Sequence, residues 1–202
     1  MPSRNRIKQW APQQIYHIYN RGNNRQEIFL DRQDYAVFLN LLKRHLTKKQ
    51  TSDRLGRPYK NWHNDIELMA FCLMPNHFHL LFYQVGDDSI SKLISSVTTS
   101  YVGYFNKRHH RVGHLFQDTF KASHIDEEVY WQHISRYIHL NPQQWRDWEW
   151  SSLQYYIGGK SVDWVRPKRV LETFVNDDYL QFVSDYQSHK EMLDELKYVT
   201  AD

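Results

Sequence analysis

The chain has 202 residues, of which 41% are hydrophobic and 15% aromatic, enough for one domain with a substantial core. Its single cysteine, Cys72, excludes an intramolecular disulfide and favours a reducing cytoplasm. The net charge is only +3, and the longest apolar run, from Leu68 to Met74, is far too short to cross a membrane, so we expect no membrane association.

The N-terminal part of the chain predicts one strand, one helix and a long loop. Residues 14–21 alternate in polarity and are rich in isoleucine and tyrosine, which favours a strand. From Asp31 the spacing becomes helical, with a stripe of apolar residues at Tyr35, Phe38, Leu39, Leu42 and Leu46. Residues 47–64 are polar and basic, so we expect a long loop that either moves or contributes to function.

The middle of the chain predicts a hairpin and a second helix. Residues 66–72 and 77–84 are apolar runs separated by a Met-Pro-Asn turn, which is typical of two adjacent antiparallel strands. Asp88 or Ser89 then caps a helix whose apolar residues keep the helical period as far as Phe105.

The last elements complete an α+β pattern. Residues 114–125 predict a strand, and a helix begins at Asp126 and ends before Pro142. The order of strands and helices favours a ferredoxin-like palm, an antiparallel sheet with helices on one face, plus a C-terminal extension. We expect one main domain over residues 1–147 and an extension with an acidic tail over 148–202.

The charge is unevenly distributed along the chain. Residues 1–170 carry 24 basic and 15 acidic side chains, whereas residues 171–202 have a net charge of −6. A basic body with interleaved aromatic residues favours a nucleic-acid partner, although a solvated basic surface would look the same. Residues 1–25 contain no acid, and their candidate phosphate-binding side chains are Arg4, Arg6, Lys8, Arg21 and Arg25.

The first candidate site is the sequence His77-Phe78-His79 on the second strand of the hairpin. Side chains alternate across a strand, so the two imidazoles share one face and Phe78 points into the core on the other. Two neighbouring imidazoles can form half of a metal site. Two ordinary, partly buried histidines would give the same pattern.

The second candidate site lies on the helix that begins at Asp126. His133, Tyr137 and Asn141 are spaced four residues apart and follow one edge of this helix, beside a core stripe that includes Ile134 and Ile138. A polar line at the border of an apolar face can form a site against a sheet. Alternatively, Tyr137 is a core tyrosine and Asn141 only ends the helix before proline.

A third candidate is the basic and polar stretch over residues 106–124. A strand and its preceding turn could follow a nucleic-acid backbone, whereas a solvated rim is the simpler interpretation. The chain contains no glycine-rich phosphate loop, no nucleophile elbow and no paired cysteines. The candidate DNA contacts in this region are Lys107, Arg108, Arg111, His114, Gln117 and Lys121.

Five strings in this order resemble the single-tyrosine HUH, or IS200-like, transposases, and in particular the REP-associated tyrosine transposases of bacteria. The strings are YHIYNRGNNRQEIF, LMPNHFHLLF, YFNKRHHRVGHLFQDTFKASHI, YIHLNP and WSSLQYY. The resemblance implies the ferredoxin-like palm and covers the chain from about Ile15 to Tyr156. Relatives often carry an arginine two residues after the glutamine of GHLFQ, where this chain has Thr119, so a DNA contact is in doubt there.

The resemblance also implies a site and a reaction. His77 and His79 match the metal ligands, Asn141 matches the residue that completes the metal site, and Tyr137 matches the nucleophile. The implied reaction is cleavage and rejoining of single-stranded DNA through a 5′-phosphotyrosine, with Mg²⁺ or Mn²⁺ as cofactor, because a phenol is a poor nucleophile at neutral pH. His133 is expected to accept the phenolic proton or to orient Tyr137.

The implied partner is a REP-like DNA hairpin with a short single-stranded flank, bound by a cytoplasmic, nucleoid-associated bacterial protein that is a monomer or a homodimer. The main alternative is a catalytically silent hairpin DNA- or RNA-binding protein on the same fold. A metal-dependent phosphodiesterase with a water nucleophile, and a purely structural zinc role for the histidines, are two further alternatives.

Overall fold

The computed structural model describes residues 10–126, 128–174 and 179–185, with the side chains of residues 128 and 129 left out. The main elements form a strand–helix–hairpin–helix–strand–helix series: β1 (Gln14–Arg21), α1 (Arg32–Leu46), β2 (Ile66–Met74), β3 (His77–Gln84), α2 (Ser89–Arg108), β4 (Lys121–Ile125) and α3 (Glu128–His139). Four short helical segments complete it: η1 (Asn23–Arg25), α4 (Gln154–Ile157), α5 (Lys168–Leu171) and α6 (Tyr179–Ser184).

The four strands form one antiparallel sheet in the order β2-β3-β1-β4. Helix α1 connects β1 to β2, and α2 connects β3 to β4, so each crossover passes over one intervening strand. This topology confirms the expected ferredoxin-like palm.

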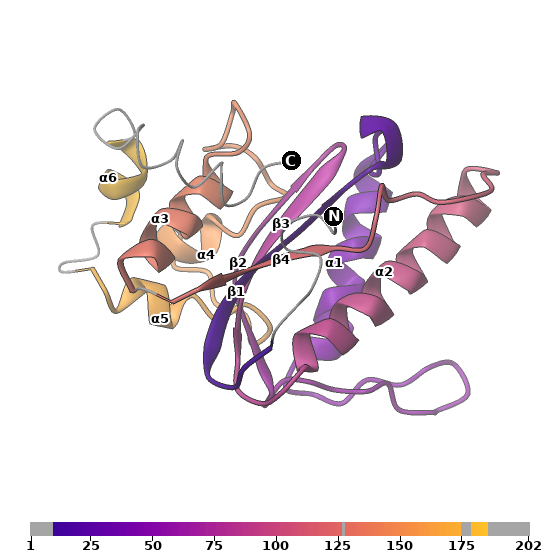
Figure 1. Cartoon of the computed structure of the whole chain (residues 1–202), viewed down its shortest axis with the longest axis horizontal. Coiled ribbons are helices and arrows are strands. Elements are labelled where there is room, and N and C mark those ends of the chain that lie inside the picture. Colours follow the sequence, from indigo (N-terminus) through magenta and orange to yellow (C-terminus); the bar gives the residue numbers. More distant parts are fainter. Residues whose placement is uncertain (1–9, 127, 175–178, 186–202) are drawn as a thin grey trace, which may run out of the picture.

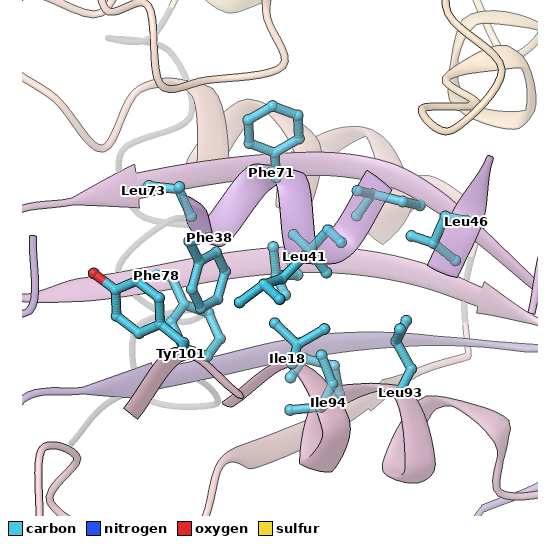
Figure 2. Packing of buried hydrophobic residues seen from close by; sticks show 14 of the residues in the cluster. Ile18, Phe38, Leu41, Leu46, Phe71, Leu73, Phe78, Leu93, Ile94 and Tyr101 are labelled. Carbon is cyan, nitrogen blue, oxygen red and sulfur yellow. The ribbon is translucent and has the colours of Figure 1, made fainter. Parts of the chain in front are cut away.

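Helices α1 and α2 cover one face of the sheet (Figure 1). Alternate residues of the central strands point to this face, including Ile18 of β1 and Phe78 of β3, both fully buried. They pack against Phe38 of α1 and Ile94 and Tyr101 of α2, as Figure 2 shows. This aromatic-rich layer is the main core and fixes the orientation of β1 and β3.

The expectation that the helices lie on one face is wrong for α3. Helix α3 and the short C-terminal helices lie on the opposite face of the sheet, so the molecule has three layers (Figure 1). The physical reason is that the other residues of the strands, such as Ile15 and Leu81, are apolar as well and need a cover. Ile134 and Ile138 of α3 provide it.

The strand expected over residues 114–125 is correct only for its second half. Residues 114–120 instead cross the end of β1, where Asn23 N donates to Leu115 O at 2.8 Å and Gln117 N donates to Arg21 O at 3.0 Å. The segment therefore follows the turn after β1 before it can pair as β4, and it brings polar residues to the end of the sheet.

The C-terminal extension runs along the outer side of β2. Leu73 N donates to Trp150 O, Ser152 N donates to Phe71 O, and Arg166 N donates to Leu68 O, at 2.7–2.9 Å. Trp164 belongs to the α1–α2 core, whereas Tyr156 belongs to the α3 core. A domain boundary at residue 147 stays a prediction. In the described part of the chain, no helix is both long and apolar enough to cross a membrane.

Candidate active site

The site begins where two central strands end side by side. Arg21, the last residue of β1, pairs with His77, the first residue of β3, and Tyr19 pairs with His79. The rings of His77 and His79 lie 5.0 Å apart at 86°, whereas Phe78 points into the opposite core. The expected separation of the histidines from Phe78 is confirmed, and both imidazoles face the α3 layer.

Helix α3 brings Tyr137 and Asn141 to these histidines. The ring of Tyr137 lies edge-on to that of His79 at 5.4 Å. Oδ1 of Asn141 lies 2.9 Å from Nε2 of His77. Asn141 is not part of the helix, which ends at His139, but the turn before Pro142 keeps it on the same side as Tyr137.

A cavity of about 530 Å³ opens at this end of the sheet. Arg21, Arg25 and Lys121 line it together with one acidic residue, Asp118, so its ionised side chains give it a net positive charge. A positive cavity of this kind suits an anionic ligand such as a phosphate. The complete lining is Tyr19, Asn20, Arg21, Arg25, Asn76, His77, Phe78, His79, Gln117, Asp118, Thr119, Lys121 and Tyr137.

Both candidate ligand histidines are held in the neutral form. Burial lowers the pKa of His77; the contact of its ring with the amide oxygen of Asn141 opposes this shift, and the charge of Arg21 adds to it. Burial lowers the pKa of His79 well below its ordinary value, with further lowering from His17 and His77. Neutral imidazoles have a free lone pair, which a metal ligand needs.

The donor set fits a divalent cation. Nδ1 of His77 lies 2.6 Å from Oδ1 of Asn76, whose amide nitrogen donates to Arg25 O. A neutral His77 that donates from Nδ1 has a lone pair on Nε2, which faces the lone pairs of Asn141 Oδ1 at 2.9 Å. Two ligands about 2.1 Å from one octahedral cation lie about 3 Å apart, so a cation would satisfy both atoms.

The described residues contain no group of three or more histidine, cysteine, aspartate and glutamate side chains placed to hold a metal ion. The candidate site is therefore two imidazoles and one amide oxygen. Imidazole nitrogens bind several divalent metals and the amide oxygen suits a harder cation, so these donors fit a divalent cation without selecting one metal.

Two residues next to the candidate ligands escaped the sequence analysis. Asn76 contacts Nδ1 of His77, and His17 contacts Nδ1 of His79 with its Nε2 at 2.9 Å. Asn76 belongs to the Met-Pro-Asn turn and could be found as the residue before the first histidine. His17 could be noticed only as a polar residue within an apolar strand, because its partner depends on the register of β1 against β3.

His133 lies away from the cavity. Its side chain is buried, its ring packs near Phe182, and Nδ1 lies 2.9 Å from Nη2 of Arg136. A guanidinium only donates, so Nδ1 of His133 accepts this bond and is not available to take up another proton. This placement does not support His133 as the proton acceptor, although it adjoins the helix turn that carries Tyr137.

The remaining DNA-contact candidates fall into three groups. Arg21, Arg25, Gln117 and Lys121 line the cavity. His114 is exposed and lines a neighbouring groove, and Lys107 is exposed at the end of α2. Arg4, Arg6 and Lys8 lie outside the described residues.

Arg108 and Arg111 have protein partners instead. Arg108 forms ion pairs of 2.7 Å with Asp31 and with Asp34, and Arg111 donates to Gln26 and Asn106. Arg108 pairs with the buried carboxylate of Asp34, which does not favour its predicted role as a DNA contact.

The loop over residues 47–64 also lies away from the site. It leads into Ile66, which pairs with Gln84 at the end of the sheet opposite His77. Trp62 of this loop is buried in the α1–α2 core. The loop therefore extends the core, and its position does not support a contribution to the candidate site.

Residues 11–141 match the family model of IS200-like transposases. The chain belongs to the IS200-like transposase family. The match covers β1 to Asn141 and thus includes His77, His79 and Tyr137. No curated protein matches this transposase.

Two solved structures superpose on this chain, and the first of them shares its fold. A REP-associated tyrosine transposase bound to a REP hairpin superposes with a TM-score of 0.57 at 16% identity, covering 81% of this chain and 92% of that chain. A putative transposase from Deinococcus radiodurans gives a TM-score of 0.40 at 17% identity, with 68% and 95% covered. The first of these likenesses agrees with the ferredoxin-like palm.

Proposed function

We propose that this IS200-like transposase is a metal-dependent endonuclease and strand transferase that cleaves single-stranded DNA beside a REP-type hairpin through a 5′-phosphotyrosine intermediate. The observation that carries the proposal is the convergence of His77, His79, Tyr137 and Asn141 at one positive cavity. A protein that only binds DNA has no need for this combination.

Tyr137 is the nucleophile in this proposal. Its phenolic oxygen attacks the scissile phosphorus as the P–O3′ bond breaks; the phenolic proton is lost and the departing 3′-oxygen takes up a proton. The products are a phosphotyrosine at the 5′ end and a free 3′-hydroxyl. The reverse attack by a 3′-hydroxyl restores a phosphodiester and releases the tyrosine, so recombination needs no nucleotide cofactor.

His77, His79 and Asn141 would hold the divalent cation, Mg²⁺ or Mn²⁺. When bound, the cation polarises the scissile phosphate and stabilises the charge that develops on it. Arg21, next to His77 in the sheet register, adds a positive charge at the same place. These residues keep the phosphate within reach of Tyr137.

The proposed DNA partner follows from the family and from the hairpin bound by the structural neighbour. Arg25, in the turn after β1, and Lys121, at the start of β4, both line the cavity and would contact flanking phosphates. A role on chromosomal repeats would make the protein nucleoid-associated, as a monomer or homodimer.

The decisive test is a covalent-adduct assay with Tyr137→Phe. End-labelled hairpin oligonucleotides with single-stranded flanks are taken from repeats near the gene, incubated with full-length protein and Mn²⁺, and analysed on denaturing gels. We expect a labelled protein band that requires metal and is lost at least 1,000-fold in Tyr137→Phe, because the oxygen that forms the bond is missing.

Tyr130→Phe is the matched control, since Tyr130 lies on the same helix outside the cavity lining. It should keep wild-type adduct formation. DNA binding without an adduct in the wild type would indicate the silent binding protein instead. Hydrolysis that persists in Tyr137→Phe would indicate a water nucleophile.

A further inference from the structure

His17 lies in the middle of β1, and the proposed reaction gives it no role. Its side chain is fully buried, and its ring stacks on those of Tyr19 and His79 with centroid separations of 5.1 Å. The ring of Tyr137 lies edge-on to it at 6.2 Å. The ring of His17 thus packs against the aromatic side chains of the candidate site.

The two ring nitrogens of His17 have different surroundings. Nε2 lies 2.9 Å from Nδ1 of His79. Nδ1 of His17 is buried and has no hydrogen-bond partner among the described residues. Two neutral histidines in this contact allow two arrangements: His79 donates from Nδ1 to His17, or His17 donates from Nε2 to His79.

Only the first arrangement suits a metal ligand. When Nδ1 of His79 carries the proton, its Nε2 has a free lone pair for a cation. His77 follows the same pattern, because its Nδ1 contacts Oδ1 of Asn76, an atom that only accepts. Each candidate ligand would then donate from Nδ1 and leave Nε2 for the metal.

The first arrangement also leaves the buried Nδ1–H of His17 without a hydrogen-bond partner among the described residues. A buried donor without a partner destabilises the fold. An apolar side chain of similar size would fill this place without that cost. The imidazole at this position therefore points to a function of its Nε2. His17 is not a third ligand, because no suitable group of three such side chains occurs in the part of the chain that the structure describes.

We propose that His17 is a positioning residue for His79: its Nε2 accepts the hydrogen bond from Nδ1–H of His79 and so fixes the ring orientation and tautomer in which Nε2 of His79 binds the divalent cation. This inference rests on the proposed function, since it assigns His17 a role only if His79 is a metal ligand.

The first experiment measures the tautomer of His79. Histidine is labelled with ¹⁵N in the full-length, metal-free protein, and long-range proton–nitrogen spectra assign the protonated nitrogen of each ring. We expect His79 to carry its proton on Nδ1 and His17 to carry its proton on Nδ1 as well. A proton on Nε2 of His79 would overturn the proposal.

The second experiment measures Mn²⁺ binding by calorimetry without DNA. His17→Phe keeps an aromatic ring but has no acceptor, and we expect its Mn²⁺ affinity to fall about 10- to 100-fold. His17→Gln places an amide oxygen where Nε2 lies and should bind Mn²⁺ within about threefold of wild type. Tautomer spectra of the His17→Phe protein should show His79 no longer held as the Nδ1–H form.

The control for general damage is His45→Gln. His45 is buried, and its Nδ1 contacts Lys60 O at 2.6 Å near the loop that lies opposite the site. This variant should lose stability but keep wild-type Mn²⁺ affinity. If His45→Gln loses as much Mn²⁺ affinity as His17→Phe, the loss in His17→Phe reflects general destabilisation. That result would overturn the proposal.

The outcomes separate this inference from the proposed function. If wild type binds Mn²⁺ and forms the Tyr137 adduct while His17→Phe binds Mn²⁺ equally well, the inference alone fails. If His17→Gln is as weak as His17→Phe, the role of the acceptor atom fails. A wild type that neither binds Mn²⁺ nor forms the adduct overturns the proposed function and this inference together.

Discussion

At the scale of single residues, the basic side chains of the cavity come from separate segments of the chain. Arg21 ends β1, Arg25 lies in the turn that follows, and Lys121 begins β4. Arg21 donates to Gln117, and Lys121 lies 5.9 Å from the ring of Tyr19. Both side chains line the cavity, where they can contact a phosphate.

Lys121→Gln should therefore weaken hairpin binding and reduce its salt dependence. Loss of one phosphate contact lowers the slope of log affinity against log salt by about 1. Fluorescence anisotropy between low and physiological salt measures this slope. Lys160→Gln, an exposed lysine that donates to Gln154 beside a different cavity, is the matched control and should bind like wild type. Equal slopes for the two variants would exclude Lys121 as a phosphate contact.

How far the site could be predicted depends on the residue. Alternation along a strand was enough to place His77 and His79 together on one face. The position of Asn141 required knowledge of where α3 ends, and its approach to His77 depends on the turn before proline. His17 could not be assigned to His79 because strand register is set by packing of the whole sheet.

At the scale of elements, Asp34 links α1 to the end of α2. Its carboxylate is fully buried, and Arg108, His109 and Tyr104 donate to it from α2 or the residue that follows. Burial alone would raise the pKa of Asp34, but these bonds, together with one from Leu30 N, lower it. The two helices are thus tied together by one charged cluster.

Arg108→Met should lower the free energy of unfolding, because it leaves the buried carboxylate with fewer donors. Arg108 is partly exposed, which keeps the loss below that of a fully buried pair. Urea unfolding checks the stability, with Lys107→Met as the exposed neighbouring control. Hairpin affinity should not change; a large affinity loss at unchanged stability would restore Arg108 as a DNA contact.

The elements themselves were largely predictable, because periods of two and of 3.6 residues separate strands from helices. The bounds of β1 and β3, and the start of α1 directly after its N-cap Asp31, agree with the sequence pattern. Residues 114–120 were wrongly predicted as a strand. They form a loop whose backbone bonds to the end of β1 and to the turn after it. The position of α3 could not be predicted in this way. Both faces of the sheet are apolar, and the sequence pattern does not show which face a given helix covers.

At the scale of the whole molecule, the α3 layer buries several histidines in addition to the candidate ligands. His139 is fully buried, and its ring nitrogens contact Tyr179 and Ser152 at 2.7 Å. Burial lowers the pKa of His139 to about 3. The folded protein therefore keeps this ring neutral at pH values where the unfolded chain binds a proton.

Acid should consequently destabilise the fold. Unfolded histidine titrates near pH 6.5, so the contribution of His139 is complete above that value and is lost as the pH falls toward 3. At pH 5 the loss is about 2 kcal/mol relative to pH 8. Urea unfolding at both pH values measures it, and His139→Gln should show a pH dependence smaller by this amount. Identical pH dependence in the two proteins would contradict the argument.

The extension that runs along β2 has a consequence for how the molecule avoids association. β2 is the outermost strand on its side of the sheet, and such strands offer unpaired amides that recruit strands from other molecules. Backbone groups of Trp150, Ser152 and Arg166 form hydrogen bonds with the backbone of β2. Tryptophans of the same segment cover the adjoining core. The C-terminal segment thus protects this edge of the sheet against pairing with strands of other molecules.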